Sequence, residues 1–261
     1  MKGPMPNFLS ASHCDDLLVR VYPTNQALGR AAADEAVDVL QAAISERGVA
    51  NVILATGNSQ LTFLHALRED SRVDWSAVNV FHMDEYLGLP EGHPASFPAF
   101  LRRHLLDAVK PRRFFAVGGQ ADQAANLCAT YEAALRAQPI DLCALGIGEN
   151  GHLAFNDPPY ADFADPVWVK VIKLAEASRR QQVGEGHFAA LDEVPTHAIT
   201  LTIPALLSAR RVLAIVPEAR KAEAVERALR GPVSEACPAS ILRRCPHARL
   251  FLDQDSAARL P

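Results

Sequence analysis

Residues 141–158 read DLCALGIGENGHLAFNDP, an apolar run that passes directly into three glycines and a histidine. A short apolar run that ends in glycine is typical of a buried strand followed by a loop. A strand that is apolar at successive positions has both of its faces covered, as in a parallel sheet between two layers of helices. The stretch therefore predicts a strand of an α/β sheet with a polar loop at its carboxyl end.

The same pattern recurs along the chain. Short, often β-branched runs alternate with longer segments of helical period, which predicts a doubly wound, mainly parallel sheet flanked by helices on both faces, a Rossmann-like α/β fold. No linker or repeat interrupts the series, so we expect a single domain over residues 1–261. The predicted strands are residues 17–22, 51–55, 78–82, 114–117, 141–145, 197–202, 211–216 and 250–252. The predicted helices are residues 25–46, 61–69, 97–109, 121–137, 205–208 and 219–229.

Residues 156–196 depart from this alternation. They contain adjacent prolines, an aromatic-rich segment and the run SRRQQVGEGHF. We expect loops and a mobile insertion here rather than another strand and helix. In open sheets of this class ligands bind beyond the carboxyl ends of the strands, so we expect the functional residues in the loops that begin there.

The composition narrows the class of protein. The chain has 261 residues, 49% of them hydrophobic, and a net charge of −4, so it can bury a sizeable core and has no basic field for nucleic acid or an anionic membrane. Its five cysteines show no CxxC spacing, which disfavours a disulfide framework or a zinc cluster. The first residues lack the apolar centre of a signal peptide. We expect a cytoplasmic protein without a nucleic-acid or membrane partner.

The first polar strand end is Thr56-Gly57-Asn58-Ser59, directly before a predicted helix. Glycine permits a sharp backbone bend, and free N–H groups at a helix start bind phosphate. The alternative is that Asn58 or Ser59 only caps the helix. The loop lacks the GxxxxGK[ST] pattern of an ATP site.

The second polar strand end carries the adjacent acids Asp84 and Glu85. Consecutive side chains on a strand point to opposite faces, so one of the two is expected to face the crevice. A carboxylate that is partly dehydrated there, near another acid, has a raised pKa and can act as a general base. The alternative is a pair of surface acids.

The third polar strand end is the opening stretch. Gly146 to Gly151 formally matches GxGxxG, but no amphipathic helix begins inside it and several strand–helix units precede it, so a dinucleotide site is not expected. We expect the glycines, Gly148 among them, to let backbone N–H groups approach a small ligand, with His152 moving protons at its edge. Asn156 and Asp157 are close enough to orient the ring. The alternative is a histidine bonded to loop carbonyls; too few ligands lie nearby for a metal.

Taken together, these stretches resemble the glucosamine-6-phosphate deaminase family and the related sugar-phosphate isomerases and lactonases. Residues 56–59 match a TGG(T/S)-type loop, residues 82–89 match NMDEY(V/L)GL, and residues 146–158 match GxGxxGHIAFNEP. The likeness in order and spacing covers most of the chain. The combined match is specific for the superfamily.

The resemblance implies conversion of an amino-sugar 6-phosphate to a ketose 6-phosphate and ammonia, without a cofactor or a metal. By position, Asp84 is the base that moves a proton from C2 to C1, and His152 opens the pyranose ring with the help of Asn150 and Asp157. The implied substrate contacts are Thr56, Gly57, Asn58, Ser59, Glu85, Gly148, Arg179 and Lys221, with Lys221 and residues 56–59 on the phosphate.

The sequence departs from the family pattern in two places. Asp157 stands where the family usually has glutamate, and the missing methylene shortens its reach by about 1.5 Å. The family's phosphate-binding arginine, in a segment like NSRFF, is unmatched, because residues 181–188 read QQVGEGHF. Either Arg179 or Arg180 substitutes for it through a bidentate contact, or both are surface charges on an ordinary helix.

Three functions are therefore compared. The leading one is a deaminating isomerase of amino-sugar phosphates. A lactonase-like hydrolase is weaker, because ester hydrolysis gives Asp84 no carbon-bound proton to remove. A sugar-phosphate-binding regulator without turnover is opposed by the intact Asp84 and His152. The sequence leaves a homo-oligomer open, since apolar helix stripes serve a core and an interface equally.

Overall fold

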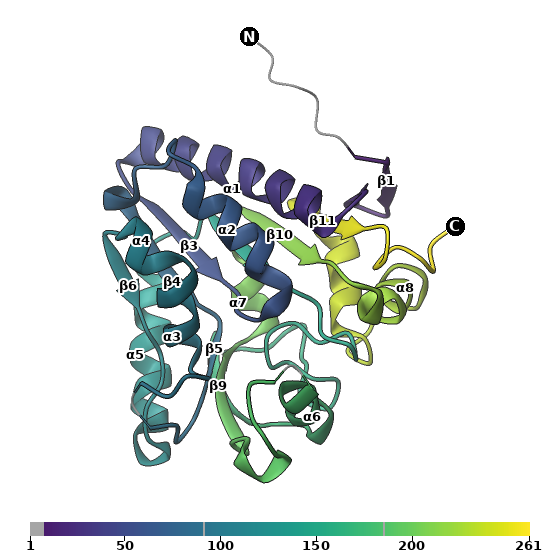
Figure 1. The fold of residues 1–261 in the computed structure, drawn as a ribbon. Coiled ribbons are helices and arrows are strands. Elements are labelled where there is room, and N and C mark those ends of the chain that lie inside the picture. The colour runs from purple at the N-terminus through teal and green to yellow at the C-terminus, as the bar shows by residue number, and fades with distance from the viewer. Residues whose placement is uncertain (1–7, 91, 185) are drawn as a thin grey trace.

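The computed structural model describes residues 8–90, 92–184 and 186–261. Its main sheet has the strand order β1-β2-β11-β10-β7-β3-β4-β6, and a smaller sheet has the order β5-β9-β8 (Figure 1). The strands are β1 Ser10–Cys14, β2 Leu17–Tyr22, β3 Ala50–Leu54, β4 Val78–His82, β5 Asp84–Tyr86, β6 Arg113–Phe115, β7 Leu142–Leu145, β8 Val169–Lys173, β9 His197–Leu201, β10 Arg211–Val216 and β11 Ala248–Asp253. The helices are α1 Asn25–Arg47, α2 Leu61–Glu69, α3 Phe97–Leu101, α4 Asp107–Val109, α5 Ala124–Arg136, α6 Glu176–Gly184, α7 Ile203–Leu207 and α8 Ala222–Arg230.

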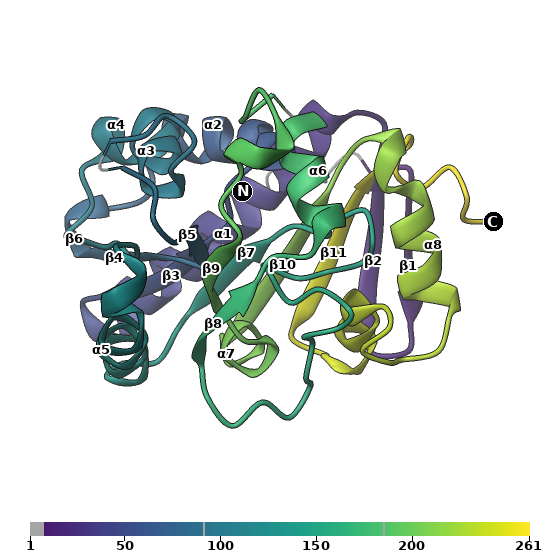
Figure 2. The ribbon, with the colours of Figure 1, turned by 90° about the horizontal axis from the view of Figure 1, so that it is seen from below.

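The main sheet is the predicted doubly wound structure. All of its pairs are parallel except β1 with β2. Helices cover both faces, with α1 and α2 on one side and α5, α7 and α8 on the other (Figure 2). The prediction of a mainly parallel α/β sheet is confirmed.

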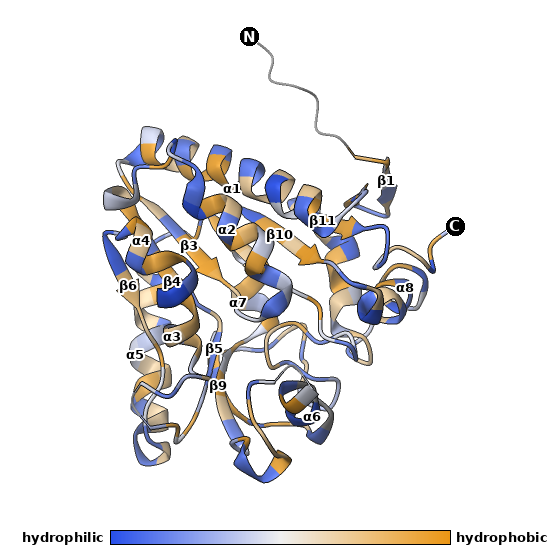
Figure 3. Ribbon diagram, viewed as in Figure 1, coloured by the Kyte–Doolittle hydropathy of each residue, from blue (hydrophilic) through white to orange (hydrophobic). Residues whose placement is uncertain are grey.

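Two apolar clusters hold these layers together. Along β3, Val52 and Leu54 pack toward α1 and α2, whereas Ile53 packs into the cluster on the opposite face. This follows from the alternation of side chains along a strand, and it makes most positions of a central strand apolar. The buried Asn51 of β3 is an exception, and its side chain donates to the carbonyl of Pro139 at 3.0 Å. The orange colour of β3 and β10 and the mixed colours of α1 in Figure 3 show this difference between buried strands and amphipathic helices.

The prediction for residues 156–196 was wrong in part. This segment contains β8, α6 and a short helical turn at Leu191–Glu193. The predicted strand at residues 197–202 forms, but it pairs with β5 and β8 rather than joining the main sheet. The strands of the small sheet pair with segments that are distant in sequence. Such pairing produces no local pattern in the sequence, so the small sheet was not predicted.

The chain order of the strands reverses between β3 and β7. From β3 the chain proceeds to β4 and β6 on one side, whereas β7 is followed by β10 and β11 on the other. Such a switch point leaves a crevice at the carboxyl ends of the two strands, where ligands bind. Within the described residues, no helix is both long and apolar enough to cross a membrane.

Candidate active site

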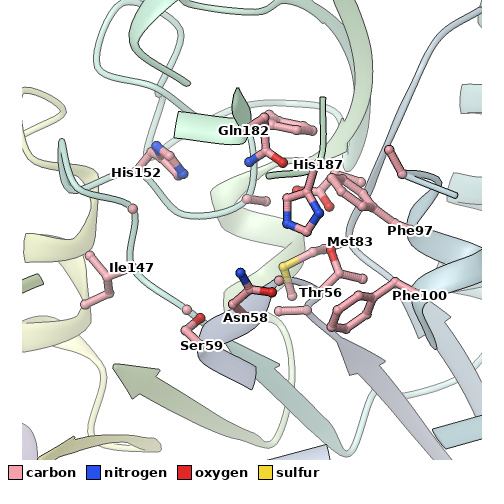
Figure 4. A pocket seen from close by; sticks show the side chains of 18 of the residues that line it. Thr56, Asn58, Ser59, Met83, Phe97, Phe100, Ile147, His152, Gln182 and His187 are labelled. Atoms are coloured by element: carbon pink, nitrogen blue, oxygen red, sulfur yellow. The ribbon is translucent and has the colours of Figure 1, made fainter. Parts of the chain in front are cut away.

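A pocket opens at the carboxyl ends of β3, β4, β7 and β10. Figure 4 shows side chains from loops far apart in the sequence entering it. Eight of the predicted site residues line this pocket, namely Thr56, Gly57, Asn58, Ser59, Asp84, Gly148, His152 and Lys221. The fold thus brings the three polar strand ends of the sequence to one cavity.

The loop after β3 presents backbone and side-chain donors to the pocket. Gly57 has φ 98°, a conformation that glycine adopts without strain, and a helical turn begins at Asn58. No side chain caps this turn, so the structure does not support the alternative in which Asn58 or Ser59 serves as a helix cap. Gln60 lies buried beneath the loop and donates to the carbonyl of Ile215 at 3.2 Å, which ties the loop to β10.

Asp84 and Glu85 point to opposite sides of β5, as the alternation of strand side chains predicts. Asp84 lines the pocket, whereas Glu85 lies on the other side of the strand and is absent from the pocket lining, contrary to its predicted substrate contact. The Glu85 carboxylate accepts hydrogen bonds from the Ser96 hydroxyl at 2.9 Å and from the N–H groups of Tyr86 and Phe97. Glu85 therefore supports β5 from behind.

The two acids differ from ordinary carboxylates in their protonation. Burial, followed by the charge of Glu85, raises the pKa of Asp84 from 3.8 to about 8. Burial also raises the pKa of Glu85 to about 7, although three donors bind its carboxylate. Hydrogen bonds are among the influences on the pKa of Glu85 but not on that of Asp84. A carboxylate in this state is a base near neutral pH.

His82 positions Asp84 and was not recognised from the sequence. Its Nε2 accepts from the N–H of Val117 at 2.8 Å, so Nδ1 carries the proton and donates to the carbonyl of Asp84 at 2.9 Å. Burial lowers the pKa of His82 to about 4, which keeps the ring neutral. A histidine at the end of an apolar strand was the available signal, but the N–H of Val117, which fixes the tautomer of the ring, lies 35 positions away in the sequence.

The loop after β7 holds His152 against a glycine. A Cβ at Gly148 would lie 2.1 Å from Cε1 and 2.3 Å from Nε2 of His152, so no residue with a side chain fits at position 148 beside this ring. The N–H of Gly148 donates to the carbonyl of His152 at 3.0 Å, which closes the loop on itself. The glycine is needed for the imidazole itself to face the pocket.

Asn150 and Asp157 orient the His152 ring. Nδ1 of His152 lies 2.7 Å from Oδ1 of Asn150 and 3.1 Å from Oδ1 of Asp157, so Nδ1 carries a proton and Nε2 is left as an acceptor. Asn150 also donates to Asp157 at 2.7 Å. Neither residue lines the pocket, so both act on His152 from behind. Asn156, expected to help, instead donates to the carbonyls of Leu153 and Leu201.

Asp157 is fully buried and anionic. Burial acts to raise its pKa, but hydrogen bonds with His152, Ser178 and Asn150 outweigh burial and leave the pKa below its ordinary value. Ser178 of α6 donates to Oδ1 at 2.6 Å, a contact between residues 21 positions apart that the sequence did not reveal. Asp157 Oδ2 has no hydrogen-bond partner among the described residues. The shorter side chain thus retains its contact with His152.

The arginines proposed as substitutes for the family arginine do not reach the pocket. The Arg179 guanidinium donates to the carbonyl of Leu191 at 2.5 Å and to that of Val194 at 2.8 Å. Arg180 pairs with Glu176 one turn away on the exposed face of α6. The prediction that Arg179 contacts substrate is therefore not supported, because backbone carbonyls occupy its side chain.

Lys221, by contrast, lines the pocket and is buried. Among the described residues that line the pocket it is the one lysine or arginine. The pocket thus combines one permanent cation, the donors of residues 56–59, a basic carboxylate and an oriented imidazole. Within the described residues, no cluster of three or more His, Cys, Asp or Glu side chains is placed to bind a metal ion.

The remaining pocket wall was not predicted. Apolar contacts come from Met83, Phe97, Phe100 and Phe155, and two polar side chains come from α6 and the loop after it, Gln182 and His187 (Figure 4). The sequence gives little indication that Gln182 and His187 line a pocket. A glutamine on a polar helix and a histidine after a glycine are common at any protein surface.

Comparison with known proteins identifies relatives of this chain. A family model described as glucosamine-6-phosphate isomerases/6-phosphogluconolactonase matches residues 23–251. A glucosamine-6-phosphate deaminase of Bacillus anthracis (strain A0248) is 36% identical over 203 residues, which cover 78% of this chain and 75% of that protein.

Solved structures share the fold. A monomeric glucosamine-6-phosphate deaminase superposes with a TM-score of 0.83 at 28% identity, over 92% of this chain and 98% of that one. A 6-phosphogluconolactonase from Trypanosoma brucei gives a TM-score of 0.74 at 21% identity, over 97% and 100% of the two chains, which is a likeness of fold alone. From the family match and the 36% identity, the chain belongs to the glucosamine-6-phosphate isomerase/6-phosphogluconolactonase family.

Proposed function

We propose that this protein deaminates and isomerises glucosamine 6-phosphate to fructose 6-phosphate and ammonia. The observation that carries the proposal is one pocket faced by a carboxylate of raised pKa, Asp84, and an imidazole of assigned tautomer, His152. These are the two groups that the reaction needs, a base at carbon and an acid–base group at the ring oxygen. The relatives that bear the deaminase name support it.

Ring opening is assigned to His152. Its Nε2 removes the proton of the C1 hydroxyl and returns a proton to the ring oxygen, which gives the open-chain aldehyde. The Asp157 carboxylate, close to Nδ1 at 3.1 Å, stabilises the imidazolium that forms between the two transfers. Asn150 fixes the relative position of His152 and Asp157 through its hydrogen bonds to both.

Isomerisation is assigned to Asp84. The carboxylate removes the proton from C2 and delivers it to C1, and one proton of the amino group passes to O1, which turns the C1 aldehyde and C2 amine into a C1 alcohol and a C2 imine. One water adds to C2 and the C–N bond breaks, so that one ammonia leaves and a C2 ketone remains. No oxidant or reductant is consumed. His82 and Glu85 act through Asp84, by holding its backbone and by raising its pKa.

Substrate is held by the opposite side of the pocket. The loop of residues 56–59 and Lys221 bind the phosphate, because backbone and hydroxyl donors beside a buried cation suit a dianion. Fixing the phosphate places the reacting carbons, so that proton transfer becomes effectively intramolecular. We also propose a cytoplasmic location, supported by five cysteines without CxxC spacing.

Incubation of the purified protein with glucosamine 6-phosphate tests the proposal. We expect stoichiometric ammonia and fructose 6-phosphate. Hydrolysis of 6-phosphogluconolactone without ammonia release would assign the protein to the lactonase branch instead. Thermal stabilisation by the sugar phosphate without either product would indicate a binding protein without turnover.

A further inference from the structure

Gln182 of α6 and His187 after it form one wall of the pocket, and the two arginines of α6 are not part of that wall. Arg179 is bonded to backbone carbonyls and Arg180 to Glu176, whereas Gln182 and His187 line the pocket. In Figure 4 Gln182 lies between His152 and His187, and the His187 imidazole lies toward Asn58 and Thr56. The polar groups that this wall offers to a substrate are therefore an amide and an imidazole.

Helix geometry places Gln182 over the pocket. Ser178 and Gln182 are four residues apart and so lie on one face of α6. Ser178 is 2% exposed and bonded to Asp157, which anchors this face directly behind His152. The next turn of the same face then reaches the pocket at Gln182. The bond that stabilises Asp157 thus also sets the position of the wall.

The end of α6 directs His187 back toward Gln182. The N–H of His187 donates to the carbonyl of Gln182 at 3.0 Å, and the N–H of Gly186 donates to that of Val183 at 3.0 Å. Gly186 has φ +79°, so this is a Schellman ending of the helix, which requires the left-handed conformation that glycine prefers. The ending turns the chain back, so that His187 and Gln182 line the same pocket.

Phe188 secures the other side of this turn. It is 7% exposed, lies edge-on to Tyr86 at 5.5 Å and stacks with His93 at 5.8 Å. Tyr86 belongs to β5, the strand that carries Asp84. His187 is consequently held between a hydrogen-bonded helix end and a buried ring, in a defined place relative to the proposed base.

We propose that Gln182 and His187 are substrate-contacting residues that determine affinity for the phosphorylated sugar, with His187 donating to the phosphate and Gln182 bonding to the sugar hydroxyls. The inference rests on the proposed function. Among the described lining residues Lys221 supplies one permanent cation, so a dianionic phosphate needs further hydrogen-bond donors. His187 lies toward the loop of residues 56–59, where the phosphate is proposed to bind (Figure 4). Asp84 and His152 already supply both proton transfers of the proposed mechanism, so the effect of Gln182 and His187 is assigned to binding rather than to the chemical step.

Steady-state kinetics of His187→Ala and Gln182→Ala test this, with Arg180→Ala as the control on the same helix. We expect the KM for glucosamine 6-phosphate to rise about ten- to a hundredfold in His187→Ala and about three- to tenfold in Gln182→Ala, at nearly unchanged kcat. Arg180→Ala should keep both constants. Inorganic phosphate, used as a competitive inhibitor, separates the two roles: its inhibition constant should rise in His187→Ala and stay unchanged in Gln182→Ala.

The outcomes are distinguishable from failure of the proposed function. If the wild-type protein binds fructose 6-phosphate in calorimetry but releases no ammonia, the proposed function fails, and the affinities of the same variants for fructose 6-phosphate still test the contacts. If His187→Ala and Gln182→Ala show the same KM and the same affinity as Arg180→Ala, the inference is overturned. A fall in kcat at constant KM would overturn it as well, because it would assign the residues to chemistry. Absence of any sugar-phosphate binding would overturn both proposals.

Discussion

Asp84 and Asp157 are two buried aspartates of one site with opposite electrostatic surroundings. Asp84 is 7% exposed, and burial together with the charge of Glu85 raises its pKa to about 8, with no hydrogen bond acting against them. Asp157 is fully buried and receives hydrogen bonds from Asn150 and Ser178, with His152 close by, and its pKa falls below the ordinary value. The same side chain is a proton acceptor at one position and a permanent anion at the other.

The difference shows that burial alone does not decide the state of a carboxylate. Desolvation is the largest influence on both groups, and the hydrogen bonds decide which way the pKa moves. A base at carbon must exchange protons near neutral pH, whereas a partner for an imidazolium must stay charged. The two loops therefore supply different surroundings for different steps.

The largest effect is expected for Asp84→Asn. Loss of the base should lower kcat/KM for ammonia release by about three to four orders of magnitude, because an amide cannot accept the C2 proton. The melting temperature at pH 8 should stay equal or increase, since the variant removes a carboxylate that is unfavourable when charged. Kinetics and a thermal melt measure both quantities. Retained activity would rule out Asp84 as the base.

Compared with Asp84→Asn, Asp157→Asn should lose more stability and less activity. The variant removes an anion that several groups stabilise, so the free energy of unfolding should fall by about 2 to 4 kcal/mol. The loss of kcat/KM should be about ten- to a hundredfold, since Nδ1 of His152 keeps Asn150 as a partner at 2.7 Å. Chemical denaturation alongside kinetics checks this. A stable but fully inactive variant would contradict the contrast with Asp84.

The pH dependence separates the two aspartates further. Asp84 must be ionised to act, so kcat/KM should fall as the pH drops below about 8. For stability the sign is opposite: the native state keeps a proton that the unfolded chain loses from about pH 4 upward, so the contribution of Asp84 to stability falls as the pH rises toward 8.

Glu85→Gln sharpens this test, because the charge of Glu85 contributes to the raised pKa of Asp84. The acidic limb of the profile should move to lower pH by up to about one unit. A limb that stays in place would show that Asp84 and Glu85 do not interact. A thermal melt serves as the control, since the variant also changes the bonds to Ser96 and Phe97.

The smallest effect is expected for Asp157→Glu, which restores the residue that is usual in the family. Asp157 already lies 3.1 Å from Nδ1 of His152, so kcat/KM should change less than about fivefold. The longer side chain must still accept from Ser178 and Asn150, which kinetics and a melt will report. A loss as large as that of Asp157→Asn would show that the aspartate is tuned to this loop.

The sequence by itself determined the parallel α/β architecture and three polar strand ends. It did so because alternation of apolar runs and glycine-rich ends is a local property of the chain, visible without knowing which strands are neighbours. It also predicted that Asp84 and Glu85 face opposite sides of a strand, which the structure confirms. These features follow from backbone periodicity alone.

Only the tertiary structure decided what surrounds these groups. Three sets of contacts join separate segments of the chain. Ser178 donates to Asp157, Arg179 donates to the carbonyls of Leu191 and Val194, and Gln182 and His187 enter the pocket. No local pattern encodes such contacts, because they depend on how sheet and helices pack. Since burial and hydrogen bonds set the pKa of a carboxylate, the chemical difference between Asp84 and Asp157 also arises at this level.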